Sequence, residues 1–598
     1  MNHKITQERL KLLRNEMKQH NIDVYLIPST DAHNSEYVPK CWERRPWISN
    51  FDGSAGEVIV TLDHAYLWTD GRYFLQAEQQ LDPLSYTLMK QTSFAPETEE
   101  WLQKNAKGKI LAVDPQTVSI NRAQNLQALM QNISGKLINL NENLIDTCKL
   151  KLGEKLDLPR NQAYHLADEY TGKNLTNKLE WLRKNLSSHN AEFIILNALD
   201  EIAWLFNIRG SDISYNPLVI SYSIIGLNEV KLFIEDCQIT QELASFFKDN
   251  DVKTYNYSDF SEHLAKIRGS IWIDDKVANY WMFDLINDNN EIIFNKSPII
   301  FEKASKNQAE ISGTKYAHIK DAVAVINFLS WLDNNWKNGV DELSCVDKLH
   351  SFRINQPNFV GESFATISGF GSNGAIIHYR VTDKTNKKID DSNLFLLDSG
   401  GQYTEGTTDI TRTIHLGNPT EEQKLHYTLV LKGHLALGRA KFPKGTRGEH
   451  LDAFARSYLW SNHLDYRHGT GHGVGSFLCV HEGPQKISQA ISTVALIPGM
   501  IVSNEPGVYI DGSHGIRIEN LCLVTEDLSK QNSGFGPFYQ FENLTLIPYA
   551  KKLIKLELLT QEEKNQIDTY YAQIKRKVKN LLNPKEQEWL EQEMNIFE

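Results

Sequence analysis

An internal repeat in the first half of the chain restricts its fold more than any other feature. Residues 9–31 align without gaps on residues 178–200, and in both copies apolar residues at helical spacing give way to a short apolar run. That order predicts a helix, a turn and a buried strand in each copy. The aligned identities are Leu10/Leu179, Leu13/Leu182, Arg14/Arg183, His20/His189, Asn21/Asn190 and Asp31/Asp200. A second echo, WISNFDG at 47–53 and WLFNIRG at 204–210, follows in the same order, so we expect two related α/β domains.

The length of the chain requires several domains. Hydrophobic cores stop growing at roughly 250–300 residues, and this chain has 598. We expect the fold class α/β (α+β), with two related N-terminal α/β domains at 1–155 and 156–310 and a third domain at 311–598. A long helix pattern begins at Ile311, and a charged pair of helices is expected after Pro548.

Composition favours an ordinary globular protein with no nucleic-acid or membrane partner. The chain is 41% hydrophobic and 23% charged, and its net charge is −12, whereas phosphate binding favours a basic surface. The six cysteines are scattered and form no CxxC pair, which fits reduced thiols better than a disulfide framework. No stretch approaches the roughly 18 apolar residues of a membrane span, and the N-terminal segment lacks the apolar region of a signal peptide. We therefore expect a cytoplasmic location.

The stretch LLDSGGQYTEGTTDITRT, residues 396–413, allows two chemistries. Ser399 within DSGG could be a nucleophile, but no glycine precedes the motif and no G-x-S-x-G elbow occurs elsewhere in the chain. Asp398, by contrast, closes an apolar run that predicts a buried strand. Asp409 lies among β-branched residues that predict a second strand, so the two aspartates can converge across a hairpin. The carboxylates are the stronger hypothesis, with surface aspartates as the alternative.

Two glutamates occupy similar places. Glu505 ends the apolar run of IPGMIVSNEPGVY, where Pro506 holds it extended, and Glu519 shares a predicted strand face with Arg517. Acidic side chains are almost never fully buried unless they are paired or bound to a metal. A salt bridge to Arg517 is the alternative for Glu519. Four carboxylates on apolar strands nevertheless favour a shared site for cations.

Four histidines accompany the carboxylates. His468, His472 and His481 lie in RHGTGHGVGSFLCVHEGP, and His378 lies in NGAIIHYR. The glycines at alternate positions make a helical zinc site implausible, and they predict a loop or bent strand that lets imidazoles approach a ligand closely. A phosphate cradle is the alternative, although no Walker lysine follows. A lone histidine such as His378 is more often a packed residue than a ligand.

The combined set predicts a metal site. Asp398, Asp409, Glu505 and Glu519 are hard oxygen donors, and one imidazole completes them. Without a cation these carboxylates would repel one another and take up protons. Oxygen-rich sites with a single imidazole suit Mn²⁺ or Co²⁺ better than structural zinc. Two cations about 3.5 Å apart can bridge a water, lower its pKa and polarise a carbonyl, which predicts hydrolysis.

These residues together resemble the signature of the pita-bread metallopeptidases, D-x10-D followed by H, E and E. Within that group the chain is similar to the aminopeptidase P family in its long, three-domain cytosolic form. The similarity runs along nearly the whole chain and includes the motifs STDAHNSEY, WISNFDGSAG, WTDGRYF, HYR, HGTGHGVGSFLCVHEGP, SNEPGVY and GIRIEN. The resemblance implies a pita-bread catalytic domain after two creatinase-like domains.

The resemblance also implies which residues bind each cation. Asp398 and Asp409 would hold one metal ion. Asp409, His472 and Glu505 would hold the other, and Glu519 would bridge the two. The family usually uses Mn²⁺, and Co²⁺ or Zn²⁺ are possible.

The same resemblance implies catalytic roles around the scissile amide. His481 would stabilise the oxyanion-like intermediate, His378 would contact the peptide carbonyl, and His468 would help to form a pocket for proline. Glu505 could also accept the proton of the bridging water. The expected reaction is release of the first residue from peptides with proline in second position, by attack of a metal-bridging water or hydroxide.

The resemblance also implies how the protein assembles, and two alternative functions stay open. The family is typically a homodimer, and Trp460 is a weaker candidate for reaching the partner's site. A prolidase acting only on Xaa-Pro dipeptides is the nearest alternative, but that class usually has one N-terminal domain. A catalytically silent pita-bread scaffold that binds peptides is the other alternative, and such a protein should have lost metal ligands.

Overall fold

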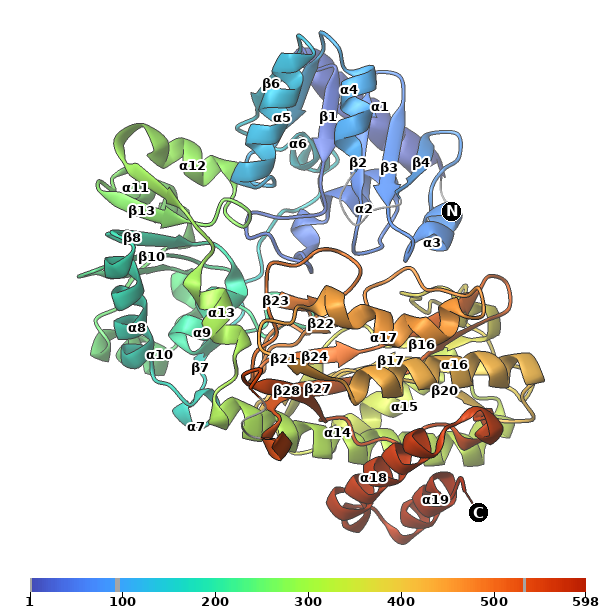
Figure 1. The fold of residues 1–598 in the computed structure, drawn as a ribbon. Coiled ribbons are helices and arrows are strands. Elements are labelled where there is room, and N and C mark those ends of the chain that lie inside the picture. Colours follow the sequence, from blue (N-terminus) through green and yellow to red (C-terminus); the bar gives the residue numbers. More distant parts are fainter. Residues whose placement is uncertain (1–2, 92–96, 531–533, 598) are drawn as a thin grey trace. The chain divides into compact units, whose positions relative to one another are not determined.

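The computed structural model describes residues 3–91, 97–530 and 534–597. The chain forms two compact units, the first of Met1–Asp168 and Lys173–Ile300, the second of Glu169–Gly172 and Phe301–Glu598. We call them unit 1 and unit 2 and describe each by itself (Figure 1). Unit 1 holds both copies of the repeat, and unit 2 holds every residue of the predicted metal site.

Unit 1 contains two six-stranded sheets of identical topology. Their orders are β4-β3-β2-β1-β5-β6 and β12-β11-β10-β8-β13-β14. In each sheet the first strand of the copy pairs antiparallel with one neighbour and parallel with the other, and both edge pairs are parallel. The strands are β1 (Val24–Ile27), β2 (Glu57–Thr61), β3 (Ala65–Thr69), β4 (Tyr86–Lys90), β5 (Ile110–Val113), β6 (Lys136–Asn139), β8 (Phe193–Leu196), β10 (Tyr222–Gly226), β11 (Val230–Phe233), β12 (Lys253–Tyr255), β13 (Ser270–Ile273) and β14 (Glu291–Phe294). The shared topology confirms two related α/β domains.

The helices of unit 1 also follow the repeat. The first copy has α1 (His3–Gln19), α2 (Arg44–Ser49), α3 (Phe74–Gln80), α4 (Thr98–Asn105), α5 (Ile120–Asn132) and α6 (Leu144–Lys151). The second has α8 (Leu175–Ser188), α9 (Leu199–Phe206), α10 (Gln241–Asp249), α11 (Phe260–Ala265) and α12 (Tyr280–Ile286). Helices α1 and α8 bury the aligned residues Leu10, Leu13 and Met17, and Leu179, Leu182 and Leu186. Each such burial contributes roughly 1.5–3 kcal/mol, which explains why these positions recur.

The asparagines shared by the two copies have a conformational cause. Asn21 and Asn190 follow the first helix of each copy with φ of 55° and 56°, and Asn50 and Asn207 end α2 and α9 with φ of 63° and 54°. Asparagine tolerates this left-handed conformation better than most side chains, and it often ends a helix there. The asparagines that recur in the two copies therefore mark equivalent turns at the ends of equivalent helices.

The main segment of unit 2 begins at Phe301, within α13 (Pro298–Ala304), and continues into the long helix α14 (Gln308–Asn335), which begins slightly before the predicted start at Ile311. The cause is a capping box. The Asn307 side chain accepts hydrogen bonds from the backbone of Ala309 and Glu310, and the Glu310 carboxylate accepts one from the Asn307 backbone at 2.9 Å. The remaining helices of the unit's body are α15 (Glu342–Arg353), α16 (Glu421–Gly438) and α17 (Gly448–Trp460), and α16 lies beside α17 (Figure 1).

Four sheets fill the rest of unit 2. Their orders are β21-β28-β27-β24-β22-β23, β15-β18-β19, β16-β17-β20 and β25-β26. The strands are β15 (Phe359–Glu362), β16 (Ile367–Phe370), β17 (Leu394–Ser399), β18 (Gly401–Tyr403), β19 (Gly406–Thr407), β20 (Ile410–His415), β21 (Lys441–Pro443), β22 (Gly471–Gly473), β23 (Glu482–Ile487), β24 (Ile501–Asn504), β25 (Gly507–Ile510), β26 (His514–Arg517), β27 (Asn520–Glu526) and β28 (Phe538–Asn543).

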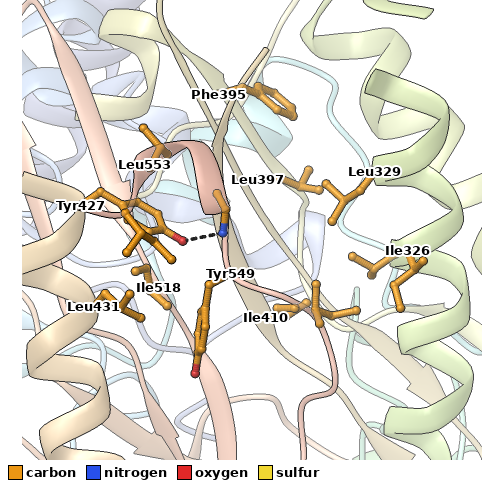
Figure 2. Close-up of a cluster of buried hydrophobic side chains, with 14 of the residues drawn as sticks. Ile326, Leu329, Phe395, Leu397, Ile410, Tyr427, Leu431, Ile518, Tyr549 and Leu553 are labelled. Atoms are coloured by element: carbon orange, nitrogen blue, oxygen red, sulfur yellow. Dashed lines mark hydrogen bonds between the residues drawn. The ribbon is translucent and has the colours of Figure 1, made fainter. Parts of the chain in front are cut away.

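The core of unit 2 lies between the β16-β17-β20 sheet and the helices. Figure 2 shows side chains from α14, β17, β20 and α16, among them Ile326, Leu397, Ile410 and Leu431, converging on one cluster. Tyr427 contributes its ring to this cluster, and its hydroxyl accepts a hydrogen bond from the Ala550 backbone at 2.9 Å. The same core therefore holds the start of the C-terminal tail.

The tail forms the expected pair of helices, α18 (Gln561–Lys577) and α19 (Pro584–Met594). Both contribute buried residues to the core of unit 2, including Ile567, Ile574 and Leu590. Among the residues that the structure describes, no helix combines the length and apolar character needed to cross a bilayer.

Two predicted strands are interrupted where they carry acidic residues. Thr408 and Asp409 separate β19 from β20, and Ile518 and Glu519 separate β26 from β27. In each case the chain leaves one sheet and enters another. The prediction that Asp409 and Glu519 lie within continuous strands was therefore wrong. The alternating pattern runs through both breaks, so it does not show where the pairing partner changes.

Candidate metal centre

The four carboxylates and His472 reach one region from four sheets. Asp398 lies on β17, which pairs with β20 as the predicted hairpin. Asp409 and Glu519 occupy the breaks described above, and Glu505 lies with Pro506 in a third break, between β24 and β25. His472 is the middle residue of β22.

Two glycines let β22 approach its neighbours closely. A Cβ atom at Gly471 would lie 2.0 Å from the Ser503 carbonyl oxygen, and one at Gly473 would lie 2.2 Å from the Glu482 carbonyl oxygen. Any side chain at these positions would push the strand away. The glycine-rich segment is thus a short strand in a loop, as predicted, and its glycines set the position of His472.

The distances show that the side chains converge. Ligand atoms of Asp409, His472 and Glu519 all lie within 4.8 Å of one another. His472 Nε2 is 3.4 Å from Asp409 Oδ2 and 3.6 Å from Glu505 Oε1. Asp398 belongs to the same group electrostatically, because the charges of Asp409 and Glu505 both raise its pKa.

Burial makes this arrangement unfavourable without a counter-charge. Burial and then the neighbouring carboxylates raise the pKa of Asp398 to about 6, although Arg517 opposes the change. The same causes raise the pKa of Glu519 well above its usual range. Burial disfavours the charged form of His472, but its hydrogen bond to Asp409 and the charge of Glu505 outweigh that effect and raise its pKa to about 9.

Several carboxylate oxygens are buried without a donor among the described residues. Asp398 Oδ1, Asp409 Oδ1 and Glu519 Oε1 have no hydrogen-bond partner there, whereas the second oxygens of Asp398 and Glu519 accept from Arg517 at 2.5 Å and Thr411 at 2.7 Å. Buried acceptors normally find a partner. Cations in front of these oxygens would supply it, so the donor set fits divalent metal ions.

Two more predicted histidines border the centre. The rings of His481 and His472 lie 4.4 Å apart between centroids and are nearly perpendicular. His468 Nδ1 is 3.8 Å from Glu505 Oε2, and His468 Nε2 lies 2.9 Å from the Tyr509 hydroxyl. His468 therefore adjoins the Glu505 carboxylate, and His481 adjoins the imidazole of His472.

His378 is placed less directly. It lies half-buried on the segment that follows the 3-10 turn Gly371–Ala375, and this turn packs against β26. Its role stays a prediction.

Similar proteins match nearly the whole chain. The pattern of metallopeptidase family M24 matches residues 312–526, and that of the C-terminal region of this family matches 537–597. Patterns of the creatinase/prolidase N-terminal domain match 9–149 and 154–310. A probable Xaa-Pro aminopeptidase P of Colletotrichum graminicola is 42% identical over 98% of both chains. That of Podospora anserina is 43% identical over 99% of this chain and 90% of its own.

This chain belongs to the aminopeptidase P family.

A solved structure supports the same membership at the level of fold. The crystal structure of X-prolyl aminopeptidase from Caenorhabditis elegans, described as a cytosolic enzyme with a di-nuclear active site, covers 99% of both chains. Its TM-score is 0.94 at 34% sequence identity. The expected fold class, creatinase-like domains followed by a pita-bread domain, is therefore confirmed for this member of the aminopeptidase P family.

The position of Ser399 in the structure agrees with membership of the aminopeptidase P family. This serine is fully buried, and its hydroxyl accepts a hydrogen bond from Arg353 at 3.1 Å. A nucleophile must reach a substrate, which a side chain so enclosed does not. The carboxylate hypothesis for residues 396–413 is the one that the aminopeptidase P fold supports.

Sequence reasoning missed how Arg517 acts. It considered a salt bridge to Glu519, but the guanidinium donates instead to Asp398 at 2.5 Å and to Tyr509 at 2.6 Å. The predicted strand put Arg517 and Glu519 on the same face, which suggested that they pair. In the structure the strand is broken at Ile518 and Glu519, so the two side chains do not follow that alternation. Tyr509, which also contacts His468, carried no signal beyond its place in SNEPGVY.

Proposed function

We propose that this protein is an Xaa-Pro aminopeptidase that uses two divalent cations to release the first residue of peptides with proline in second position. The convergence of Asp409, His472 and Glu519 around buried acceptors without donors carries the proposal. Membership of the aminopeptidase P family supports the substrate class, and the di-nuclear site of the Caenorhabditis elegans relative supports two cations.

We assign the ligands as the resemblance implies. Asp398 and Asp409 would hold one cation, Asp409, His472 and Glu505 would hold the other, and Glu519 would be shared between them. When bound, such a pair activates a water molecule as the nucleophile and polarises the peptide carbonyl. Because the donors are mainly carboxylate oxygens, we propose Mn²⁺ as the preferred ion, with Co²⁺ or Zn²⁺ as substitutes.

The protein's own groups supply the proton transfers and the orientation. Glu505 Oε1 accepts a hydrogen bond from Ser503 at 3.0 Å, which leaves the carboxylate oriented to accept a proton from the nucleophile. Arg517 is permanently charged and keeps Asp398 ionised. His481 and His378 are assigned to the carbonyl oxygen as negative charge develops on it.

Recognition of proline poses a separate problem, because the Xaa-Pro amide has no N–H to donate. We assign this task to three rings beside the metal centre, those of His468, Tyr466 and Tyr509. The His468 ring lies 4.8 Å from that of Tyr466 and 5.5 Å from that of Tyr509, measured between centroids. Rings recognise a pyrrolidine by contact and need no backbone donor.

Location and assembly complete the proposal. We propose a cytoplasmic enzyme, in line with scattered thiols and with the cytosolic description of the Caenorhabditis elegans relative. We also propose a homodimer in which Trp460, 44% exposed at the end of α17, contacts the partner. Sedimentation of the wild-type protein and of Trp460→Ala tests the assembly. The acidic net charge of −12 argues against a nucleic-acid partner.

The decisive experiment compares two peptides. Metal-free protein is reconstituted with Mn²⁺, Co²⁺ or Zn²⁺ and given Arg-Pro-Pro or Arg-Pro. We expect free arginine from the tripeptide, only after metal is added, and little from the dipeptide. Faster cleavage of Arg-Pro would indicate a prolidase. Two bound cations without cleavage of either peptide would indicate the silent scaffold.

A first variant tests the ligand assignment. Asp409→Asn removes a charge that both cations share, so kcat/KM for Arg-Pro-Pro should fall by more than about a hundredfold and metal content should drop. Asp511→Asn, an exposed aspartate in the turn after β25, is the matched control. Unchanged activity in Asp409→Asn would refute the assignment.

A further inference from the structure

Arg412 is a buried cation that lacks the usual kind of partner. It lies on β20 with 2% of its surface exposed. All its hydrogen bonds with described residues go to neutral oxygens, and none goes to a carboxylate. The acceptors are the carbonyls of Thr411 (2.9 Å), Glu519 (2.7 Å), Ile547 (2.7 Å) and Pro548 (3.1 Å), the Asn520 amide oxygen (2.8 Å) and the Tyr570 hydroxyl (3.2 Å). Burying a charge is costly unless strong interactions compensate it, so this arrangement needs a reason.

One end of the guanidinium fixes Glu519. Its Nη1 donates to the carbonyls of both Thr411 and Glu519. The Thr411 hydroxyl in turn donates to Glu519 Oε2 at 2.7 Å, and the Glu519 backbone N–H donates to the Thr411 carbonyl at 3.1 Å. Glu519 lies in a break between strands, where sheet hydrogen bonds do not fix its backbone. Arg412 and Thr411 replace them and hold the residue at its backbone and at its carboxylate.

The other end of the guanidinium binds the C-terminal tail. Nη2 and Nε donate to Ile547 and Pro548, at the point where the chain leaves the six-stranded sheet. The Tyr570 hydroxyl of α18 also contacts Nη2, and it exchanges hydrogen bonds with both backbone groups of Ile547 at 3.1 and 2.8 Å. Tyr570 thus holds Ile547 in place, and the carbonyls of Ile547 and Pro548 in turn bind Arg412.

A guanidinium suits this position. It binds the backbone of Glu519, whose carboxylate lies beside Asp409 in the proposed metal centre. Its five donors lie on one rigid fork, so a single side chain can reach acceptors from several segments at once. An uncharged side chain of similar length without donors would leave the Glu519 and Pro548 carbonyls without the hydrogen bonds that Arg412 donates to them.

We infer that Arg412 is a positioning residue for Glu519, and that α18 supports the metal centre through Tyr570 and Arg412. This inference rests on the proposed function, because it takes Glu519 as a metal ligand. The C-terminal tail is therefore part of the apparatus that sets metal affinity, although it contributes no ligand.

The test uses the full chain and Co²⁺ alone as the probe. The variants are Arg412→Lys, Arg412→Met, Tyr570→Phe and, as matched control on the same helix, Tyr571→Phe. Among the described residues, the Tyr571 hydroxyl forms hydrogen bonds with Tyr549 alone. Calorimetric titration gives the Co²⁺ affinity, and visible absorption reports the coordination of bound Co²⁺. Groups behind metal ligands typically change affinity by 10–100-fold, so we expect that loss in both Arg412 variants, smaller for lysine. Tyr570→Phe should lose a few-fold, and Tyr571→Phe should match the wild type.

Activity adds a second readout. For Arg-Pro-Pro at saturating Co²⁺, the Arg412 variants should keep KM within about twofold and lose kcat, because Glu519 serves the reacting centre and not peptide binding. A merely structural role would lower the melting temperature without changing the Co²⁺ spectrum. Circular dichroism checks that each variant is folded.

The outcomes separate the inference from the proposed function. Wild-type protein that binds no Co²⁺ would overturn the proposed function. If the wild type binds Co²⁺ and the folded Arg412 variants bind it with the same affinity and the same spectrum, only the inference is overturned. If neither Arg412 variant folds, Tyr570→Phe decides, since weaker Co²⁺ binding than in Tyr571→Phe supports the inference and equal binding overturns it.

Discussion

At the scale of single residues, protonation and metal binding would compete for the proposed ligands. His472 has a pKa of about 9 in the protein without cations, because its attraction to Asp409 and Glu505 outweighs its burial. At neutral pH its imidazole therefore carries a proton on a nitrogen that a cation needs. Metal affinity must depend on pH in this molecule, since ligands bind metals only in their deprotonated form.

We predict that binding of the first Mn²⁺ equivalents at pH 7 releases at least one proton, most of it from His472. Because the pKa is raised to about 9, apparent affinity should rise about tenfold per pH unit as pH increases toward that value and level off above it. Calorimetry in buffers of different ionisation enthalpy measures the released protons. Affinity that does not change between pH 6 and 8 would contradict the assignment of His472.

Glu342 illustrates a second role for a buried charge. It is fully buried at the start of α15 and accepts hydrogen bonds that hold the segment carrying His378. The donors are the Phe370 backbone (2.7 Å), the Asn373 amide (2.9 Å), the Tyr379 hydroxyl (3.0 Å) and the Lys387 backbone (2.9 Å). The Glu342 side chain thus connects residues that precede His378 with residues that follow it.

We predict that Glu342→Gln lowers the free energy of unfolding by about 2–3 kcal/mol. The amide offers one acceptor oxygen where the carboxylate offers two, so buried donors lose their partner. Urea unfolding measures the effect, and Glu526→Gln, an exposed glutamate at the end of β27, is the control. Equal midpoints for both variants would show that the network is dispensable.

At the scale of elements, caps and close contacts decide where each helix and strand begins. The capping box of α18 pairs Thr560 with Glu563, whose carboxylate also accepts from Lys432 of α16 at 2.6 Å. The cap therefore fixes the helix end and its packing together. Signals of this kind are short and local, which is why the long helix and the C-terminal pair could be predicted from sequence.

We predict that Thr560→Ala destabilises unit 2 by about 1 kcal/mol, the usual contribution of such a cap. Thr569→Ala on the same helix is the matched control, because Thr569 is exposed in the helix interior, where alanine is well tolerated. Thermal unfolding of the two variants provides the measurement. A loss of stability in Thr569→Ala equal to that in Thr560→Ala would contradict the role of the cap.

Other features of the elements could not be predicted, because they depend on partners far along the chain. The alternation of TTDITRT and GIRIENLCLV predicts continuous strands, yet Asp409 and Glu519 lie where the pairing changes sheet. Arg517 binds Asp398, 119 positions away, and the charge pattern alone placed it beside Glu519. The types and order of the proposed ligands could be predicted from the sequence. The residues that hold these ligands in place could be identified only from the fold.

At the scale of the whole molecule, the repeat and the metal residues belong to different units. Unit 1 consists of two domains of one topology and contributes none of the five proposed ligands. Full-length similarity to aminopeptidase P relatives includes both copies of this topology. Cations should therefore stabilise unit 2 and leave the intrinsic stability of unit 1 unchanged.

We predict that calorimetric scans of the metal-free protein show a transition that rises when Mn²⁺ is added. At a concentration a hundredfold above the dissociation constant, a ligand stabilises the folded state by about 2.7 kcal/mol. The transition that moves should be the one that Thr560→Ala lowers, and it should not move in Asp409→Asn. A rise of equal size in Asp409→Asn would place the stabilising cations elsewhere.

The breaks at Asp409, Glu505 and Glu519 have a mechanical consequence. Each one is a joint where the backbone passes between sheets, and Asp398 and His472 belong to strands on either side. A pair of cations bound at this junction would connect four sheets through the few atoms of the proposed ligands. Chelation should loosen the catalytic unit first at its centre, while its outer helices stay folded.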